Sequence, residues 1–514
     1  MLDVTSMGNI VHADGLSQQD SDRLYRLIQL WSAKLPRNRL RRMYYEQKVL
    51  PKNIGIAISD EMVKKLNPSC GWAAKAVDML ADRSVLDGFV FEDGSTDEKL
   101  DRIMRDNKVY EKYITNVHDE LAHSVVFWTL SRGKVGRSNV RIKSHTAETA
   151  AGIWNGGEER IDCGFAIIDT AAQYPTTNIE VPVTVNLYTD EATVVLTRYS
   201  PTSENWRAEY QRHPMGRPLI EPMAYSPSAI RPFGRSRITR AVMSIVDCKL
   251  RADMRAEIAS ETISQPQKYL LGATDEAFEV DDWSAFFGNM FITGKDEDGD
   301  IPTFGQLSQG SMQPMTEYTR NLAAQFAGET SIPISSLGII HDNPASAEAI
   351  AAAERDMVQL AEHLNETNGN ALRNVALMAM AMSNGLGTSI DKLSDVQYSV
   401  TADFRDPSMP NIAATADAWT KIASVQGADW IAQTEEYLEA MNIPLSKRIR
   451  MLNQKRVIDG RSFMMEGFGG KDTEVGNQGV RRGASEDSGR FERVRVEGFT
   501  GEDEQGGSNG RVVA

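Results

Sequence analysis

Apolar residues in the first part of the chain recur every three to four positions, which is the period of an amphipathic helix. One such stripe, at residues 17–49, begins with a capping pair formed by Ser17 and Asp20, and Pro36 is expected to break or kink the helix. Two more helices are predicted at about residues 69–83 and 96–122, with a short strand in VLDGFVFEDG between them. The chain therefore begins with a set of helices.

From about residue 124 to residue 225 the apolar pattern changes its period. Short β-rich runs such as VVFWTL, FAIIDT and VPVTVNLY alternate with turns made of Gly, Asn, Pro and Asp. Runs of this length, bounded by turn residues, are typical of strands. We expect a mostly antiparallel sheet region here.

Helical periodicity returns after the stretch RPFGRSRITR, residues 231–240, which contains the chain breakers Pro232 and Gly234. A phosphate-binding loop at a helix N-terminus would present several glycine amides, and only Gly234 is available. We therefore interpret the stretch as a joint between the sheet region and a helix at about 235–264. The arginines that lie largely off the apolar stripe of this helix are Arg237, Arg240, Arg251 and Arg255.

The second half of the chain is predicted to be mainly helical. After a compact unit of strands and acidic turns, a helix is expected at 313–327, and the loop GETSIPISSLGIIHDN precedes a very long helix at 344–383. Asn343 and Pro344 suit the start of that helix, and Gly369 is expected to weaken its middle. Shorter helices are expected at about 411–424, 427–440 and 446–459. From residue 466 onward Gly, Glu, Asp, Arg and Ser predominate, which predicts disorder.

Composition and charge narrow the range of functions. The 514 residues include 56 Lys and Arg against 71 Asp and Glu, so the net charge is 56 − 71 = −15, which disfavours tight non-specific binding to DNA. The cysteines Cys70, Cys163 and Cys248 stand far apart, which suits a reducing compartment and argues against structural zinc. We expect no secretory signal at the N-terminus and no membrane span.

The motifs that suggest catalysis depart from the patterns that catalysis needs. In HDELAH the histidines His118 and His123 are five residues apart, whereas a zinc-binding helix places two histidines four apart on one face. The acidic run DEDGD, residues 296–300, lacks the glycine and glutamate that a calcium loop requires at its sixth and twelfth positions. We therefore predict no enzymatic activity, no metal and no cofactor. A metal-dependent hydrolase that uses His118, His123 and the Asp296 cluster is the alternative from another class.

The order of these elements, over roughly residues 20–460, resembles that of the portal proteins of tailed bacteriophages. The segments that carry the resemblance are RRMYYEQKVL (41–50), WAAKAVDMLADRSVLDGFVF (72–91), RPFGRSRI (231–238), SIPISSLGIIHDNPASAEAIAAAE (331–354) and FRDP (404–407). The third is similar to the G-x-S-x-I opening of the family's first stem helix, and the fourth is similar to its channel-facing loop and the helix that follows. In the first segment Gln47 stands where the family usually has glycine.

This resemblance implies an α+β portal fold with wing, stem, clip and crown regions, in which long helices accompany a mostly antiparallel sheet region. The implied regions are a wing at 1–234, a first stem helix at 235–264, a clip at 265–312, a second stem helix at 313–329, a channel loop at 330–343, a long wing or crown helix at 344–384, a crown at 385–465 and a disordered tail at 466–514.

The resemblance also implies a function and a set of partners. A ring, usually a dodecamer, would occupy one capsid vertex of the virion as the head–tail connector and serve as the channel for DNA packaging and DNA ejection. The implied partners are other copies of the chain, the terminase large subunit, the major capsid protein and scaffold, head–tail adaptor proteins and the passing double-stranded DNA. The resemblance implies that no membrane is involved and that assembly takes place in the bacterial host cytoplasm. Another structural or adaptor protein of the phage head is the alternative.

Three groups of residues are the candidate sites. The residues expected to line the channel are Ser335, Ser336, Leu337, Ile339 and His341, because small and apolar contacts would not brake moving DNA. The residues assigned to the stem are Arg237, Arg240, Arg251 and Arg255. The aromatic residues assigned to the clip, as a core within and between subunits, are Trp283, Phe286, Phe287 and Phe291.

Overall fold

The structure is a computed structural model of the chain. It describes residues 5–50, 60–174, 179–264, 268–271, 303–306, 308, 310–339, 347–384, 389–408, 412–425, 430–431, 434–441 and 443–468. The chain falls into two units, Met1–Asn453 and Gln454–Ala514, and the elements below belong to the first unit apart from the second half of the last helix. The clip aromatics Trp283, Phe286, Phe287 and Phe291, together with His341, lie outside the described residues.

The chain begins with helices, as predicted, and two of them, η1 (Thr5–His12) and α2 (Asp60–Leu66), were not predicted from the sequence. The others are α1 (Gln18–Tyr45), α3 (Trp72–Ala81), α4 (Glu98–Asp106) and α5 (Val109–His123). Ser17 caps α1, and its hydroxyl accepts a hydrogen bond from the Asp20 amide at 3.2 Å. Of the break or kink predicted at Pro36, the break is wrong, because α1 runs through this residue, and the kink stays a prediction. The buried face that includes Trp31 and Leu35 holds the helix together despite the missing amide.

The single helix predicted at 96–122 is two helices, α4 and α5. The chain turns between them at Lys108, which has a left-handed φ of 56°. The side-chain amide of Asn107 donates to the carbonyls of Ile103 at 2.9 Å and Val140 at 2.8 Å, and its oxygen accepts from the amide of Ile142 at 2.8 Å. A buried asparagine bonded to a neighbouring strand thus ends α4.

Two antiparallel sheets follow, as the sequence predicts. The three-stranded sheet has the order β3-β2-β9, made of β2 (Val125–Val135), β3 (Ser138–Thr146) and β9 (Ile220–Ala224). The five-stranded sheet has the sequential order β4 to β8, made of β4 (Ala150–Asn155), β5 (Arg160–Ala172), β6 (Glu180–Tyr188), β7 (Ala192–Arg198) and β8 (Trp206–Arg212). Each strand pairs antiparallel with its neighbours.

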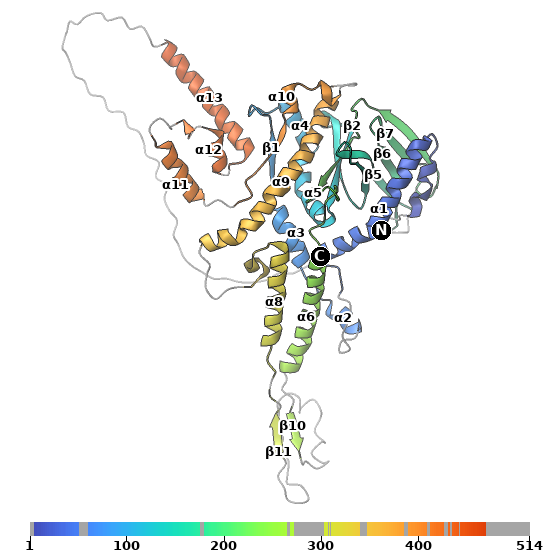
Figure 1. Ribbon diagram of the computed structural model, residues 1–514, viewed down its shortest axis with the longest axis vertical. Coiled ribbons are helices and arrows are strands. Elements are labelled where there is room, and N and C mark those ends of the chain that lie inside the picture. Colours follow the sequence, from blue (N-terminus) through green and yellow to red (C-terminus); the bar gives the residue numbers. More distant parts are fainter. Residues whose placement is uncertain are drawn as a thin grey trace, which may run out of the picture. The chain divides into compact units, whose positions relative to one another are not determined.

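Long helices make up much of the rest. α6 (Arg240–Ser264) and α8 (Gln313–Thr330) pack side by side, and the antiparallel pair β10 (Lys268–Leu271) and β11 (Thr303–Gln306) lies between them in the chain (Figure 1). The short η3 (Ile334–Leu337) precedes α9 (Ala347–Ser383), which packs on the three-stranded sheet. The remaining elements are η4 (Ile390–Lys392), α10 (Asp395–Tyr398), β12 (Thr401–Phe404), α11 (Ile412–Ala423), α12 (Glu435–Ala440) and α13 (Leu445–Phe468).

Strand β1 (Leu86–Val90) joins distant parts of the chain, because it pairs antiparallel with β12. Gly369, in the middle of α9, faces this pair: a Cβ at this position would lie 3.3 Å from the ring of Phe404. α9 is continuous through Gly369. The glycine therefore allows the helix to approach β12 closely and does not interrupt it.

Two hydrophobic cores lie in the first unit. One fills the space between η1, α1 and the five-stranded sheet, where Trp31 meets Phe165 edge to face at a centroid distance of 5.8 Å. The larger core gathers α3, α5, α6 and α9 around the three-stranded sheet. Both cores follow the apolar stripes of the sequence.

A chain of polar side chains runs through the larger core. The amide of Asn368 donates to Glu120 at 2.9 Å and to the hydroxyl of Tyr113 at 3.2 Å. Tyr113 bonds to Ser84 at 2.7 Å, and Ser84 donates to Asn365 at 2.6 Å. These bonds connect α5 to α9, and they fix the register between the two helices more strictly than apolar packing alone would do.

Glu120 is fully buried and has no cation within ion-pairing distance among the described residues. Burial raises the pKa of Glu120 to about 8, although the hydrogen bond from Asn368 lowers it. The folded protein therefore keeps a proton that the unfolded chain releases above about pH 4.3. The stability that this proton provides is fully present below about pH 4.3 and is lost as the pH rises through about 8.

We expect Glu120→Gln to remove this pH dependence, because glutamine can accept the same hydrogen bond and releases no proton. Urea denaturation should find the variant similar to the parent near pH 4.5 and more stable near pH 8. The gain in the free energy of unfolding should be several kcal/mol, because a tenfold change in proton affinity between the folded and unfolded chain corresponds to about 1.4 kcal/mol. Glu111→Gln, at an exposed position of the same helix, is the control and should follow the parent. Parallel pH profiles for the parent and Glu120→Gln would contradict this account.

Candidate functional site at the joint between the sheets and the long helices

The joint at 231–240 uses its own amides for internal bonds. Gly234 has a φ of 66°, and a Cβ there would lie 2.1 Å from the carbonyl oxygen of Tyr225, so only glycine fits. The amide of Arg235 donates to that carbonyl at 3.0 Å, and the amide of Arg237 donates to Leu121 at the end of α5 at 2.8 Å. The hydroxyl of Ser236 donates to Ala122 at 2.6 Å. The stretch thus fastens β9 and α6 to α5 and presents no cradle of free amides to a phosphate.

Arg237 lies before α6, and its side chain is buried with 6% exposure. The prediction that it lies on the stem helix, largely off the apolar stripe, is wrong, because the turns of the joint delay the start of the helix to Arg240. Its guanidinium donates to the carbonyl of Ala76 in α3, to that of Thr330 at 2.5 Å and to the hydroxyl of Tyr225 at 3.3 Å.

The same guanidinium joins the two helices that flank the expected channel segment. Thr330 is the last residue of α8, where the helix dipole favours a positive charge. Nη2 of Arg237 also lies 3.8 Å from the sulfur of Met357, a fully buried residue of α9. No carboxylate among the described residues forms an ion pair with Arg237. Carbonyl groups from separate elements therefore satisfy a buried charge.

The other stem arginines lie on α6 itself. Arg240 and Arg255 are exposed and Arg251 is partly exposed, off the buried stripe that includes Val242 and Leu250. Arg251 donates to Cys248 on the same helix at 3.1 Å. α6 is held against the N-terminal helices where Tyr44 donates to Asp247 at 2.8 Å.

The segment after α8 forms a compact turn before the described residues end at 339. Ile332 is buried, and the single turn of η3 follows it and ends at Gly338 with a φ of 83°. Ser335 is exposed and Ser336 is partly exposed, whereas Leu337 packs against the larger core. Ile339 is partly exposed. Of the residues expected to line a channel, the two serines are thus the most available for outside contact, together with Ile339.

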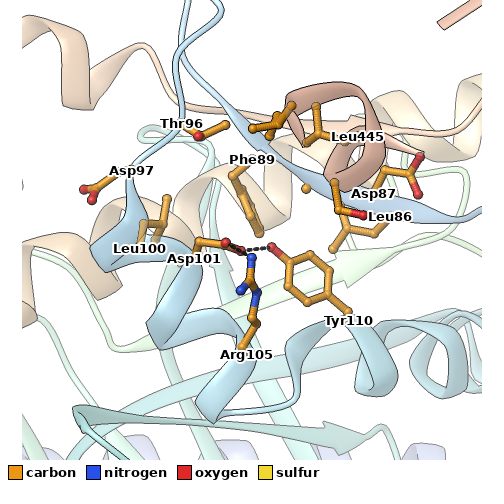
Figure 2. Close-up of a pocket in the computed structure, with 13 residues that line it drawn as sticks. Leu86, Asp87, Phe89, Thr96, Asp97, Leu100, Asp101, Arg105, Tyr110 and Leu445 are labelled. Atoms are coloured by element: carbon orange, nitrogen blue, oxygen red, sulfur yellow. Dashed lines mark hydrogen bonds and ion pairs between the residues drawn. The ribbon is translucent and has the colours of Figure 1, made fainter. Parts of the chain in front are cut away.

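A pocket of about 260 Å³ lies between β1, α4, the start of α5 and the first turn of α13 (Figure 2). Leu445 closes one side of it, and a Cβ at Gly88 would lie 2.3 Å from the Leu445 side chain. Figure 2 shows Arg105 and Tyr110 directed at Asp101, and Tyr110 donates to this carboxylate at 3.0 Å. Asp101, Arg105 and Tyr110 thus bond one another, and Leu445 lies against the same pocket.

The two histidines of HDELAH lie in different surroundings. Nε2 of His118 is 3.6 Å from a carboxylate oxygen of Asp78, whereas Nε2 of buried His123 is 3.2 Å from Glu148. Within the part of the chain that the structure describes, no group of three His, Cys, Asp or Glu side chains could hold a metal ion. The Asp296 cluster lies outside that part. No helix among the described residues is long and apolar enough to cross a membrane.

Two features of the site escaped the sequence pattern. The burial of Arg237 was hidden because an arginine within a basic stretch is usually solvated. The presence of Gly234 three residues before it was the only signal in the sequence. The polar chain through Glu120 and Asn368 was hidden because the two residues are far apart in sequence. The only sign of this polar chain in the sequence is that Glu120 and Asn368 interrupt helix faces that are otherwise apolar.

A family model and two similar proteins all indicate the same family. The model of the family described as "Phage portal protein, SPP1 Gp6-like" matches residues 25–428. The portal protein of Mycobacterium phage D29 is 26% identical over 389 residues, which is 74% of this chain and 77% of the relative. The portal protein of Mycobacterium phage L5 is 27% identical over 397 residues, with the same coverage of 74% and 77%.

Among solved structures, the chain is similar to one in the virion of a native gene transfer agent particle, with a TM-score of 0.39 and 11% identity over 73% of this chain and 90% of that chain. The chain is also similar to one in the neck of the native particle, computed with C12 symmetry. That match has a TM-score of 0.38 and 12% identity, and it covers 73% of this chain and 90% of that chain. The family model spans most of the 514 residues, from α1 through α11. The chain belongs to the SPP1 Gp6-like family of phage portal proteins.

Proposed function

We propose that twelve copies of this portal protein close into a ring at one vertex of a phage capsid, and that DNA passes through the ring during packaging and ejection. The observation that carries this proposal is the family match over residues 25–428, which includes the joint, α6, α8 and α9. In this ring the chain acts as a structural part, and a separate terminase motor supplies the ATPase activity.

The regions of the ring follow from this proposal. The N-terminal helices and both sheets form the wing, α6 and α8 form the stem, and residues 265–312 form the clip. Residues 330–343 form the channel loop, α9 is the long helix behind it, and residues 385–465 form the crown. The clip meets the terminase and later the head–tail adaptors, while the wing meets the major capsid protein and scaffold during assembly in the host cytoplasm.

The charge of the chain suits a channel for DNA. With 71 acidic and 56 basic residues, the ring surrounds DNA with a wall that does not hold phosphates tightly. Strong contacts between arginine or lysine and phosphate would resist sliding, because each contact must be broken again as the DNA moves. Ser335, Ser336 and Ile339 offer small neutral contacts after α8, which suits a surface that touches moving DNA.

Assembly is the first test of the proposal. Native mass measurement of the full chain at micromolar concentration should find closed rings, about 680 kDa for twelve copies of 56.9 kDa. Electron micrographs should show a central hole wide enough for duplex DNA. Monomers or dimers alone, both with and without capsid components, would overturn the ring.

The channel loop has its own test. Ser335→Arg combined with Ser336→Arg adds two positive charges next to the DNA path, and we expect rings to form while DNA packaging slows several-fold, because new phosphate contacts brake transport. The control is Thr115→Arg combined with Thr202→Arg, which adds the same charge at exposed positions elsewhere. Packaging and DNA retention equal to the parent in the loop variant would show that this segment is not the constriction.

A further inference from the structure

A hollow of about 420 Å³ lies between α1 and residues 230–235, which include the first half of the joint. Its lining includes Trp31, Phe127 and Phe233 together with small residues at the start of β4. Phe233 is held in place by Phe127 and Trp154, at centroid distances of 5.9 and 6.0 Å. The hollow therefore has an aromatic wall built by the fold.

Five cations line this hollow, and none of the described residues that line it is acidic. They are Lys34, Arg37, Arg41, Arg231 and Arg235. Among the described residues, none of the five forms an ion pair. Glu148, next to Ala147 of the lining, is already engaged with Arg42 at 3.2 Å and His123 at 3.2 Å. In a chain with a net charge of −15, an unneutralised cluster of this size stands out.

Arg41 shows how poorly this charge is compensated. One of its terminal nitrogens donates to the carbonyl of His123 at 3.0 Å, but its Nε is buried without a hydrogen-bond partner. Burial and the neighbouring Arg37 lower the pKa of Arg41 to about 10. An anion in the hollow would reduce the repulsion between the two guanidinium groups.

The mouth of the hollow adds an apolar contact. Ile230 is 91% exposed, more than any other large apolar side chain among the described residues, and Leu30 on α1 is 46% exposed. Exposed aliphatic side chains beside arginines and aromatic residues are typical of protein interfaces. Aliphatic side chains contribute nothing to binding a phosphate backbone, so this mouth favours a protein partner.

We propose that the hollow receives an acidic segment with a bulky apolar residue from a second copy of this chain, and so forms part of the contact between neighbouring subunits. This inference rests on the proposed ring. A ring closes through two different complementary faces, and each copy then fills the hollow of the next one. The neighbouring copy has 71 acidic residues against 56 basic ones, so it can supply the missing carboxylates.

Charge reversal in the hollow tests the inference. Arg37→Glu combined with Arg231→Glu changes two exposed residues, and native mass titration should require at least tenfold more protein for half-assembly of rings. High salt should weaken parental rings in the same direction, because screening reduces the attraction. The control, Lys134→Glu combined with Arg137→Glu, reverses two exposed charges on the β2–β3 hairpin and should assemble like the parent. Thermal melts of the separated subunits would show that both variants fold.

A photo-crosslinking amino acid in place of Ile230 gives a second, direct readout. On irradiation of assembled rings, we expect covalent dimers of this chain, with the crosslinked peptide rich in Asp and Glu. Equal assembly of the charge-reversed and parental chains would overturn the inference, as would crosslinks from position 230 to DNA or to a different protein. If the parent itself forms no rings, the proposed function fails; if the parent and the charge-reversed variant form rings equally well, only the hollow's role fails.

Discussion

A buried guanidinium that pairs with no carboxylate in the part of the chain that the structure describes governs how the long helices join the sheets. Arg237 bonds to α3 at Ala76, to the end of α8 at Thr330 and to Tyr225 after β9. Removing this charge would leave carbonyl groups from separate elements without a donor, which costs more than a typical hydrogen bond contributes. The geometry of the joint, including the glycine conformation at Gly234, serves to bring this side chain into the interior.

The contacts of Arg237 also hold the two helices that flank the proposed channel loop. The segment between α8 and α9 starts beside Thr330, and α9 passes the same guanidinium at Met357. A second bond supports α9 nearby, where Arg83 pairs with Glu354 at 2.9 Å. Further along, Asn368 ties α9 to Glu120. The loop that would touch DNA therefore follows the end of α8 and precedes α9, and both helices are bonded to the same core.

Much of this architecture could be predicted from local pattern, and some of it could not. The antiparallel sheet region, the stripe of α6 and the start of α8 at Gln313 follow from patterns that are set by neighbours in sequence. The predicted end of α8 at residue 327 is wrong, because the helix runs through Gly328 to Thr330. The break at Lys108 and the burial of Arg237 depend on carbonyl groups from distant strands and helices, and one sequence contains no record of such contacts. The clip aromatics and His341 stay predictions, because they lie outside the described residues.

Hydrogen exchange on the full chain tests most directly whether Arg237 fastens the channel segment to the fold. In Arg237→Met, the amides at the end of α8 and at residues 331–339 should exchange roughly tenfold faster or more, while the five-stranded sheet keeps its parental rates. Arg240→Met, at an exposed position, should leave both regions unchanged. Parental rates at residues 331–339 in Arg237→Met, or equal acceleration throughout both sheets, would contradict the account.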